Sequence, residues 1–177
     1  TASAKADAKF YNTTTLEQLK AGLTVQRIDE AGKAADVTDF TVSATLPLAT
    51  DKTNTVTVTA GDLSTTVTVE AAEDTVKSIA VTKQPNKRVY TSGELLDLTG
   101  MEITATYESG ATEVVTTGYT TDVEAGTVMT VKEYGPSKII TVTYKDNKNN
   151  GKTITKELKV GDDVPYRNIK VAFDFHV

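Results

Sequence analysis

The chain has 177 residues, no cysteine, no tryptophan and a single histidine, His176. These absences exclude a disulfide scaffold, a cysteine-ligated zinc site and a cysteine nucleophile, and they nearly exclude a histidine base. A net charge of -5 and a pI near 5.0 argue against nucleic acid as a partner, because nucleic-acid binding requires a basic patch. No apolar run approaches the length of a membrane-spanning helix, so membrane insertion is not expected.

Short helical signals occur at two places in the sequence. Thr14 and Glu17 have the spacing of a capping box, and the helix that follows is predicted to end within two turns, at Gly22. A similar short piece is predicted at Ser92–Leu98, where it ends at Gly100.

Most of the chain instead alternates with period two. Threonine makes up about one residue in five, and β-branched enrichment of this size favours strands. Valine or isoleucine alternates with threonine in four segments, which predicts strands with one buried face and one solvated face. These segments are Thr55–Thr59, Thr66–Val69, Ile140–Tyr144 and Thr153–Thr155. A turn at Gly61-Asp62 separates the first two.

An internal repeat relates the two halves of the chain. The matched positions are apolar residues and turn glycines, at offsets of about 78 early in the repeat and about 84 after a longer insertion. The pairs include Tyr11 and Tyr90, Gly22 and Gly100, Val25 and Ile103, Gly32 and Gly110, Val37 and Val115, and Val58 and Val142. What repeats is therefore a core with its turns, and two copies of one small β domain are predicted.

The second copy carries a further pattern, in which a tyrosine precedes a Gly-Glu-x-Leu-Asp-Leu-x-Gly stretch and a Thr-Tyr-x-x-Gly hairpin. Its elements are Val76–Val81, Tyr90, Gly93, Leu95–Gly100, Thr104–Tyr107 and Gly110. This pattern resembles the bacterial Ig-like domain. The first copy is more divergent, with Thr14 in place of Gly93. Its residues 1–8 give no equivalent of the first strand, so either the given sequence cuts into that strand or something else replaces it. The resemblance implies Ig-like sandwiches in exported bacterial proteins and carries no catalytic residues.

Turn signals every 8 to 12 residues and the scarcity of helices favour antiparallel sandwiches. The fold class expected is all-β, as two tandem Ig-like β-sandwich domains with Greek-key character. Residues 1–73 form the divergent copy and residues 74–161 the second copy. Residues 162–177 form a C-terminal strand, which either starts a further domain or serves assembly.

Two places in the sequence could bind calcium. Asp146–Gly151 with Glu157 partly fits an EF-hand loop, but Lys148 occupies a ligand position, so a polar hairpin loop is favoured. Acidic residues also gather around the predicted domain boundaries, where a solvated linker is the simpler interpretation. They are Glu70, Glu73, Asp74, Asp162 and Asp163.

Three other chemistries have weaker support in the sequence. Asp122 and Glu124 could act as an acid–base pair on a glycoside, but nothing in the sequence marks a sugar cleft. Lysines could form isopeptide bonds to Asn or Asp, although most lysines are expected to be surface charges. Asn12–Thr14 has the pattern of a glycosylation sequon, but in a bacterial protein this pattern is more typical of a turn. No catalytic, cofactor-binding or metal-binding residue is assigned, and no cofactor is expected.

Residues 169–177 alternate sharply, with Ile169, Val171, Phe173, Phe175 and Val177 on one face. The expected function is that of a non-catalytic spacer at the outside of a bacterial cell, holding an adjacent region away from the surface. One alternative is adhesion or carbohydrate binding, which an aromatic cluster of Tyr119, Tyr134 or Tyr166 would favour. Another is a self-assembling subunit of a surface layer, filament or phage tail that adds strand 169–177 to a neighbour. The partners would then be other subunits, a cell-surface protein or a glycan.

Overall fold

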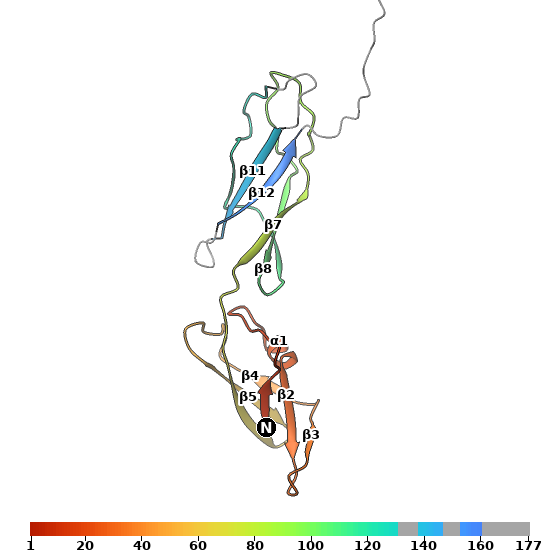
Figure 1. Ribbon diagram of the computed structural model, residues 1–177, viewed down its shortest axis with the longest axis vertical. Coiled ribbons are helices and arrows are strands. Elements are labelled where there is room, and N and C mark those ends of the chain that lie inside the picture. Colours follow the sequence, from red (N-terminus) through yellow and green to blue (C-terminus); the bar gives the residue numbers. More distant parts are fainter. Residues whose placement is uncertain (131–137, 147–152, 161–177) are drawn as a thin grey trace, which may run out of the picture. The chain divides into compact units, whose positions relative to one another are not determined.

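The computed structural model describes residues 1–130, 138–146 and 153–160 (Figure 1). Antiparallel strands dominate these residues, with a single short α-helix among them, so the all-β prediction is confirmed. The chain divides into two compact units. Unit 1 comprises Thr1–Thr75 together with the turn Tyr107–Ala111, and unit 2 comprises Val76–Thr106 and the described residues from Thr112 onward.

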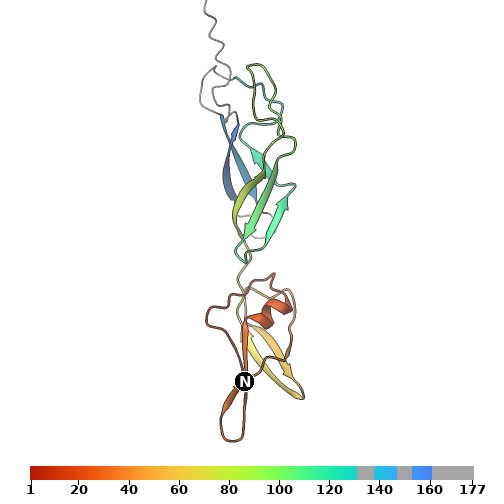
Figure 2. The same ribbon diagram turned by 90° about the vertical axis from the view of Figure 1, so that its right-hand side faces the viewer.

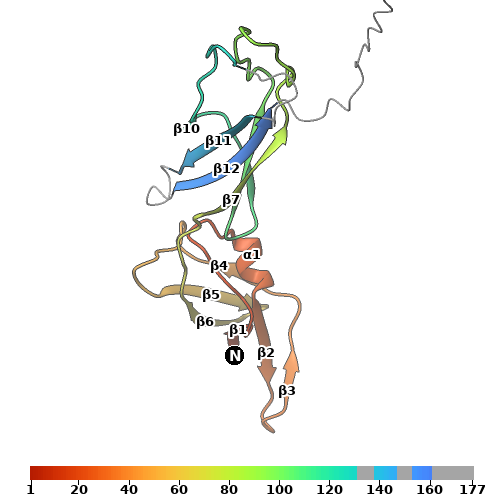
Figure 3. The same ribbon diagram turned by 45° about the horizontal axis from the view of Figure 1, so that its top comes forward.

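Unit 1 contains two three-stranded sheets, ordered β1-β2-β3 and β4-β5-β6 (Figure 3). The strands are β1 (Ala2–Ala4), β2 (Leu23–Ile28), β3 (Ala34–Asp36), β4 (Thr41–Ser43), β5 (Asn54–Ala60) and β6 (Leu63–Val69). The predicted turn at Gly61-Asp62 is confirmed, because Ala60 pairs with Leu63 and Gly61 adopts a φ of 56°. Strong valine alternation on both arms places this hairpin in a single register.

Helix α1 (Leu16–Ala21) begins one residue later than predicted. Thr15 is the N-cap, and its capping box is completed by Gln18 rather than by Glu17. The hydroxyl of Thr14 is already engaged, since it accepts a 2.7 Å hydrogen bond from the Tyr11 N–H and is buried. The predicted end at Gly22 is confirmed.

Unit 2 repeats the strand order of unit 1, with sheets β7-β8-β9 and β10-β11-β12. The strands are β7 (Val76–Lys83), β8 (Glu102–Tyr107), β9 (Thr112–Val115), β10 (Tyr119–Thr121), β11 (Lys138–Lys145) and β12 (Thr153–Val160). Figure 2 shows the blue strands β11 and β12 against the green strands of the other sheet. The alternating segments at Ile140–Tyr144 and Thr153–Thr155 lie in β11 and β12, as predicted.

The short helix predicted at Ser92–Leu98 is wrong. The backbone there bonds across to the segment 126–129 instead, with Leu96 N–H donating to Thr127 O at 2.8 Å and Met129 N–H donating to Glu94 O at 2.7 Å. A short apolar stretch between two glycines resembles the sequence of a short helix. The N–H and C=O groups that a helix would have paired locally are paired here with residues far along the chain.

Apolar side chains from both sheets of unit 1 form one buried core. Its members are Phe10, Leu19, Leu23, Val25, Phe40, Leu48, Val56, Val58, Val69 and Ala71. Unit 2 buries corresponding positions, with Ile103 of β8 matching Val25 of β2 and Val142 of β11 matching Val58 of β5. In both units the first strand lies near the last one, β1 near β6 and β7 near β12.

The turns at Gly32 and Gly110 are closed by matching backbone hydrogen bonds. Asp29 N–H donates to Lys33 O in one turn and Tyr107 N–H donates to Ala111 O in the other. Each glycine has a φ above 80°, a conformation in which glycine avoids the strain that a Cβ would add. The matched turn glycines of the sequence therefore have the same local structure.

Candidate functional site

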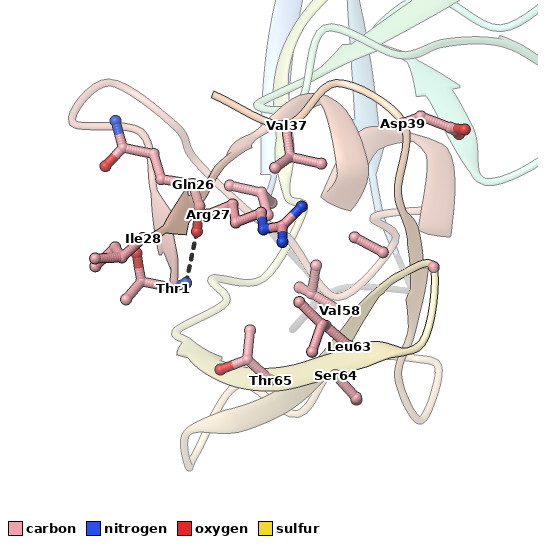
Figure 4. A pocket seen from close by; sticks show the side chains of 13 residues that line it. Thr1, Gln26, Arg27, Ile28, Val37, Asp39, Val58, Leu63, Ser64 and Thr65 are labelled. Carbon is pink, nitrogen blue, oxygen red and sulfur yellow. Dashed lines mark hydrogen bonds between the residues drawn. The ribbon is translucent and has the colours of Figure 1, made fainter. Parts of the chain in front are cut away.

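An opening between the two sheets of unit 1 has a volume of about 700 Å³ (Figure 4). We refer to it as the unit 1 opening. It is lined by Thr1, Val25, Gln26, Arg27, Ile28, Val37, Asp39, Val58, Ala60, Gly61, Leu63, Ser64 and Thr65. Cavities of this size can take up a small ligand or several side chains.

The walls of the unit 1 opening are mainly apolar. Val58 is only 1% exposed, whereas Leu63 and Ile28 are 62% and 52% exposed, respectively. Arg27 and Asp39 add one charge of each sign to the lining. In Figure 4 the exposed Leu63 lies next to Val58, whereas Ile28 lies beyond Thr1 on the other side of the opening.

Strand β1 borders the opening. Thr1 exchanges two backbone hydrogen bonds with Gln26, at 2.7 and 2.9 Å, and so extends the pairing of β1 with β2 (Figure 4). Thr1 itself lies in the lining of the opening.

The first strand of unit 2, β7, contributes buried side chains to the core of that unit. Strand β7 has eight residues, and its side chains Val76 and Ile79 are buried, with Val76 at 0% exposure.

A buried carboxylate in unit 1 organises a second cluster. Asp74 is 2% exposed, and its oxygens accept hydrogen bonds from the Thr13 hydroxyl at 2.7 Å and from the Ser109 N–H and hydroxyl at 2.9 and 2.8 Å. Its N–H donates to the side chain of Asn12 at 3.0 Å. Polar groups satisfied in this way stabilise a local structure rather than offer a vacant ligand set.

In unit 2 the hydroxyl of Tyr90 joins two loop segments. It donates to Lys87 O or Asp97 O, at 3.1 and 2.9 Å, and accepts the Asp97 N–H at 2.9 Å. Lys87 lies 4.9 Å from the centre of the same ring and pairs with Glu94 at 2.9 Å. The Lys87 side chain, followed by the Thr91 N–H, lowers the pKa of Glu94 below its ordinary 4.5.

The calcium hypotheses gain no support. Asp146 is fully buried at the end of β11 and has further interactions, while residues 147–152 and the Glu157 side chain lie outside the described structure. Within the described residues no three acidic or histidine side chains gather to hold a metal ion. Glu70 and Glu73 stand near Asp74 in the sequence, but the Asp74 carboxylate is already satisfied by hydroxyl and N–H groups.

Several of the other residues singled out in the sequence take part in local hydrogen bonds. Asp122 accepts the Thr141 N–H at 2.8 Å next to β10, and Glu124 is exposed in the following loop. Asn12, Thr13 and Thr14 form a bonded turn, as the structural interpretation of the sequon predicted. Tyr119 is half-buried on β10. Tyr134, Asp162, Asp163, Tyr166, the segment 169–177 and His176 lie outside the described residues.

Sequence reasoning missed both the unit 1 opening and the central role of Asp74. Neither feature had a sequence signal, because the residues involved are far apart in the chain. The lining of the opening includes Val25 and Leu63, and the Asp74 partners Thr13 and Ser109 are 61 and 35 residues away.

No family model, curated protein or solved structure was found to match this chain. No helix among the described residues is long and apolar enough to cross a membrane.

Proposed function

We propose that this chain is a non-catalytic, load-bearing spacer from the outside of a bacterial cell, built from two tandem Ig-like β-sandwiches. The Ig-like assignment draws support from two facing three-stranded sheets in each unit, in the same strand order, and from the sequence pattern around Tyr90. The exported location rests on that sequence resemblance.

The observation that carries the mechanical part is the pairing of the beginning of unit 1 with its end. Tyr11 and Ala72 form a parallel bridge. Ala72 N–H donates to Phe10 O at 3.0 Å, and Asn12 N–H donates to Ala72 O at 2.9 Å. Because the two segments run in the same direction, tension on the ends slides one along the other. Hydrogen bonds loaded in this way must break together instead of one after another.

Unit 2 has a related arrangement. Strand β7 lies near β12, and both run in the same direction in Figure 1 and Figure 3. Its longest ladder, between β11 and β12, joins eight residue pairs from Lys138 with Val160 to Lys145 with Thr153. Entry and exit strands that run in parallel are suited to resisting tension along the chain.

Single-molecule force spectroscopy tests the proposal. The chain has no cysteine, so paired cysteines introduced at chosen positions define the pulling points without interference. We expect unit 1 to unfold at a higher force when it is pulled through Thr1→Cys and Thr75→Cys than through Ala31→Cys and Asp62→Cys. The second pair lies on two hairpin turns and separates the sheets instead of shearing the paired segments.

The variant Ala72→Pro provides a matched check on the mechanism. Proline lacks an N–H, so the bond to Phe10 O is lost, and the force needed through the chain ends should fall toward the value for the hairpin pair. Equal forces in the two geometries, or an unchanged force in Ala72→Pro, would contradict a load-bearing role for this pairing.

A further inference from the structure

The turn 107–111 belongs to unit 1, although the chain on either side of it forms β8 and β9 of unit 2. Both backbone groups of Glu108 bond to other parts of unit 1. Its N–H donates to Thr75 O at 2.9 Å, and its C=O accepts the Tyr11 hydroxyl at 3.1 Å. These partners lie in the two segments that pair with each other at Tyr11 and Ala72, so the turn is bonded to both segments.

The next residue of the turn uses its side chain as well as its backbone. Ser109 donates its N–H and its hydroxyl to the buried Asp74 carboxylate, at 2.9 and 2.8 Å. Hydrogen bonds to a charged acceptor are stronger than bonds between neutral groups. A buried acceptor that loses its donors also pays the cost of being left unsatisfied. The turn therefore contributes to the stability of unit 1.

The internal repeat shows that these bonds are not a general requirement of such a turn. In the matched turn 29–33, Ala31 stands where Ser109 stands, and the turn is still closed by the matching backbone bond. The matched tyrosine also has a different use, because the Tyr90 hydroxyl bonds to backbone groups of its own unit. The serine at position 109 and the bond from Tyr11 therefore connect this one turn to unit 1.

We propose that the turn 107–111 couples the folding of unit 1 to that of unit 2, so that unit 1 has its full stability only while β8 and β9 are formed. When unit 2 unfolds, the turn becomes part of a flexible chain, and ordering it again costs conformational entropy at each residue. The four hydrogen bonds of Glu108 and Ser109 to unit 1 are then lost. The coupling is a property of folding, so it holds whether or not the chain bears load.

Native-state amide hydrogen exchange of the full chain tests the coupling, with β5 amides reporting on unit 1 and β11 amides on unit 2. Ile140→Asp places a charge at a completely buried position of β11 and should unfold unit 2. We expect the protection of β5 to fall at least about tenfold in this variant, because bonds to a charged acceptor are lost. Ile139→Asp makes the same change at the neighbouring exposed position and should leave the protection of β5 unchanged.

Ser109→Ala separates the turn from every other effect of unfolding unit 2. It should lower the protection of β5 about tenfold in the wild-type background. In Ile140→Asp the turn is already released, so the same change should have little further effect. Equal losses in the two backgrounds would overturn the proposal, as would wild-type protection of β5 in Ile140→Asp.

A second pair of variants keeps the test decisive if Ile140→Asp prevents the whole chain from folding. Coupling between two units is reciprocal, so Tyr11→Phe, a change in unit 1, should lower the protection of β11 as well as that of β5, by about two- to tenfold. Thr15→Ala removes the N-cap of α1 and should lower the protection of β5 alone. If both variants affect only β5, the turn does not couple the two units and the proposal fails.

Discussion

Units 1 and 2 share a strand order and differ most at their first strand. In unit 1 an opening of about 700 Å³ lies beside β1, whereas in unit 2 the strand β7 buries Val76 and Ile79. The strand that enters a unit therefore contributes side chains to its core, and Val58 of unit 1 borders the opening.

The largest expected effect comes from one substitution made at matched positions in both units. Val142→Ala removes two methyl groups from a fully buried site in unit 2 and should cost about 2–3 kcal/mol of unfolding free energy, from the lost transfer energy and the cavity left behind. Val58→Ala should cost only about 1–2 kcal/mol, because the space it leaves merges with the existing opening.

Urea unfolding followed by unit-specific NMR signals measures both values. Equal losses at the two positions would show that Val58 is enclosed as fully as Val142, and the contrast between the two cores would then fail.

The two matched turns offer a second comparison. The buried carboxylate of Asp74 accepts two hydrogen bonds from Ser109 of the turn 107–111 and a third from Thr13, whereas the exposed Asp29 stabilises the turn 29–33 through one bond from Lys33 N–H. Asp74→Asn should therefore destabilise unit 1 by about 2 kcal/mol, since bonds to a charged acceptor are lost. Asp29→Asn should change stability by less than about 0.5 kcal/mol. Thermal unfolding of the two variants checks the difference, and similar melting points would contradict it.

Gly22 and Gly100 occupy matched positions for different reasons. Gly22 has an ordinary φ of -83°, but a Cβ there would lie 2.6 Å from the buried Phe10 ring. Gly100 has a φ of 84°, and a Cβ there would meet only the flexible side chain of Asn86. Each change to alanine should cost about 1–2 kcal/mol, from overpacking at Gly22 and backbone strain at Gly100.

A second substitution separates these two causes. Phe10→Leu should rescue part of the Gly22→Ala loss in a double-mutant cycle, because it removes the atoms that clash. Asn86→Ala should leave most of the Gly100→Ala loss in place, because backbone strain does not depend on that side chain. Rescue of both variants to the same extent would mean that steric contact governs both sites.

The smallest effect concerns pH. In unit 1 the N–H of Thr15 is bonded by the neutral Gln18 side chain, and in unit 2 the N–H of Thr91 is bonded by Glu94, each at 2.8 Å. Because folding lowers the pKa of Glu94 below its ordinary 4.5, its contribution is present above that value and is lost as the pH falls through the lowered pKa. Acid should therefore loosen the unit 2 segment and leave the unit 1 cap unchanged.

Carboxyl NMR titration measures this shift directly. Lys87→Met should move the pKa of Glu94 back toward 4.5, because the bond from Lys87 is its main cause. The pKa of Asp97 is lowered chiefly by hydrogen bonds from Thr99, so it serves as an internal reference that should move little. Equal changes at both carboxyl groups would point to a general charge effect instead of the specific pair.

Much of the fold could be predicted because its signals are local. Alternation located β5, β6, β11 and β12, and the glycine at position 61 located a hairpin turn. The helix start was displaced by one residue, since the hydroxyl of Thr14 bonds to the Tyr11 N–H. Ser92–Leu98 was misassigned as helical because segment 126–129, far along the chain, supplies its hydrogen-bond partners.

The sequence by itself determined the all-β class and the matched turns, because side-chain alternation and glycine φ preferences act over a few neighbouring residues. Only the tertiary structure decided that Asp74 is a buried acceptor and that Val58 lies beside an opening between the sheets of unit 1. The physical reason is that burial and hydrogen-bond satisfaction depend on what lies opposite a residue in space. Thr13 and Ser109 meet Asp74, although they are far from it in the sequence.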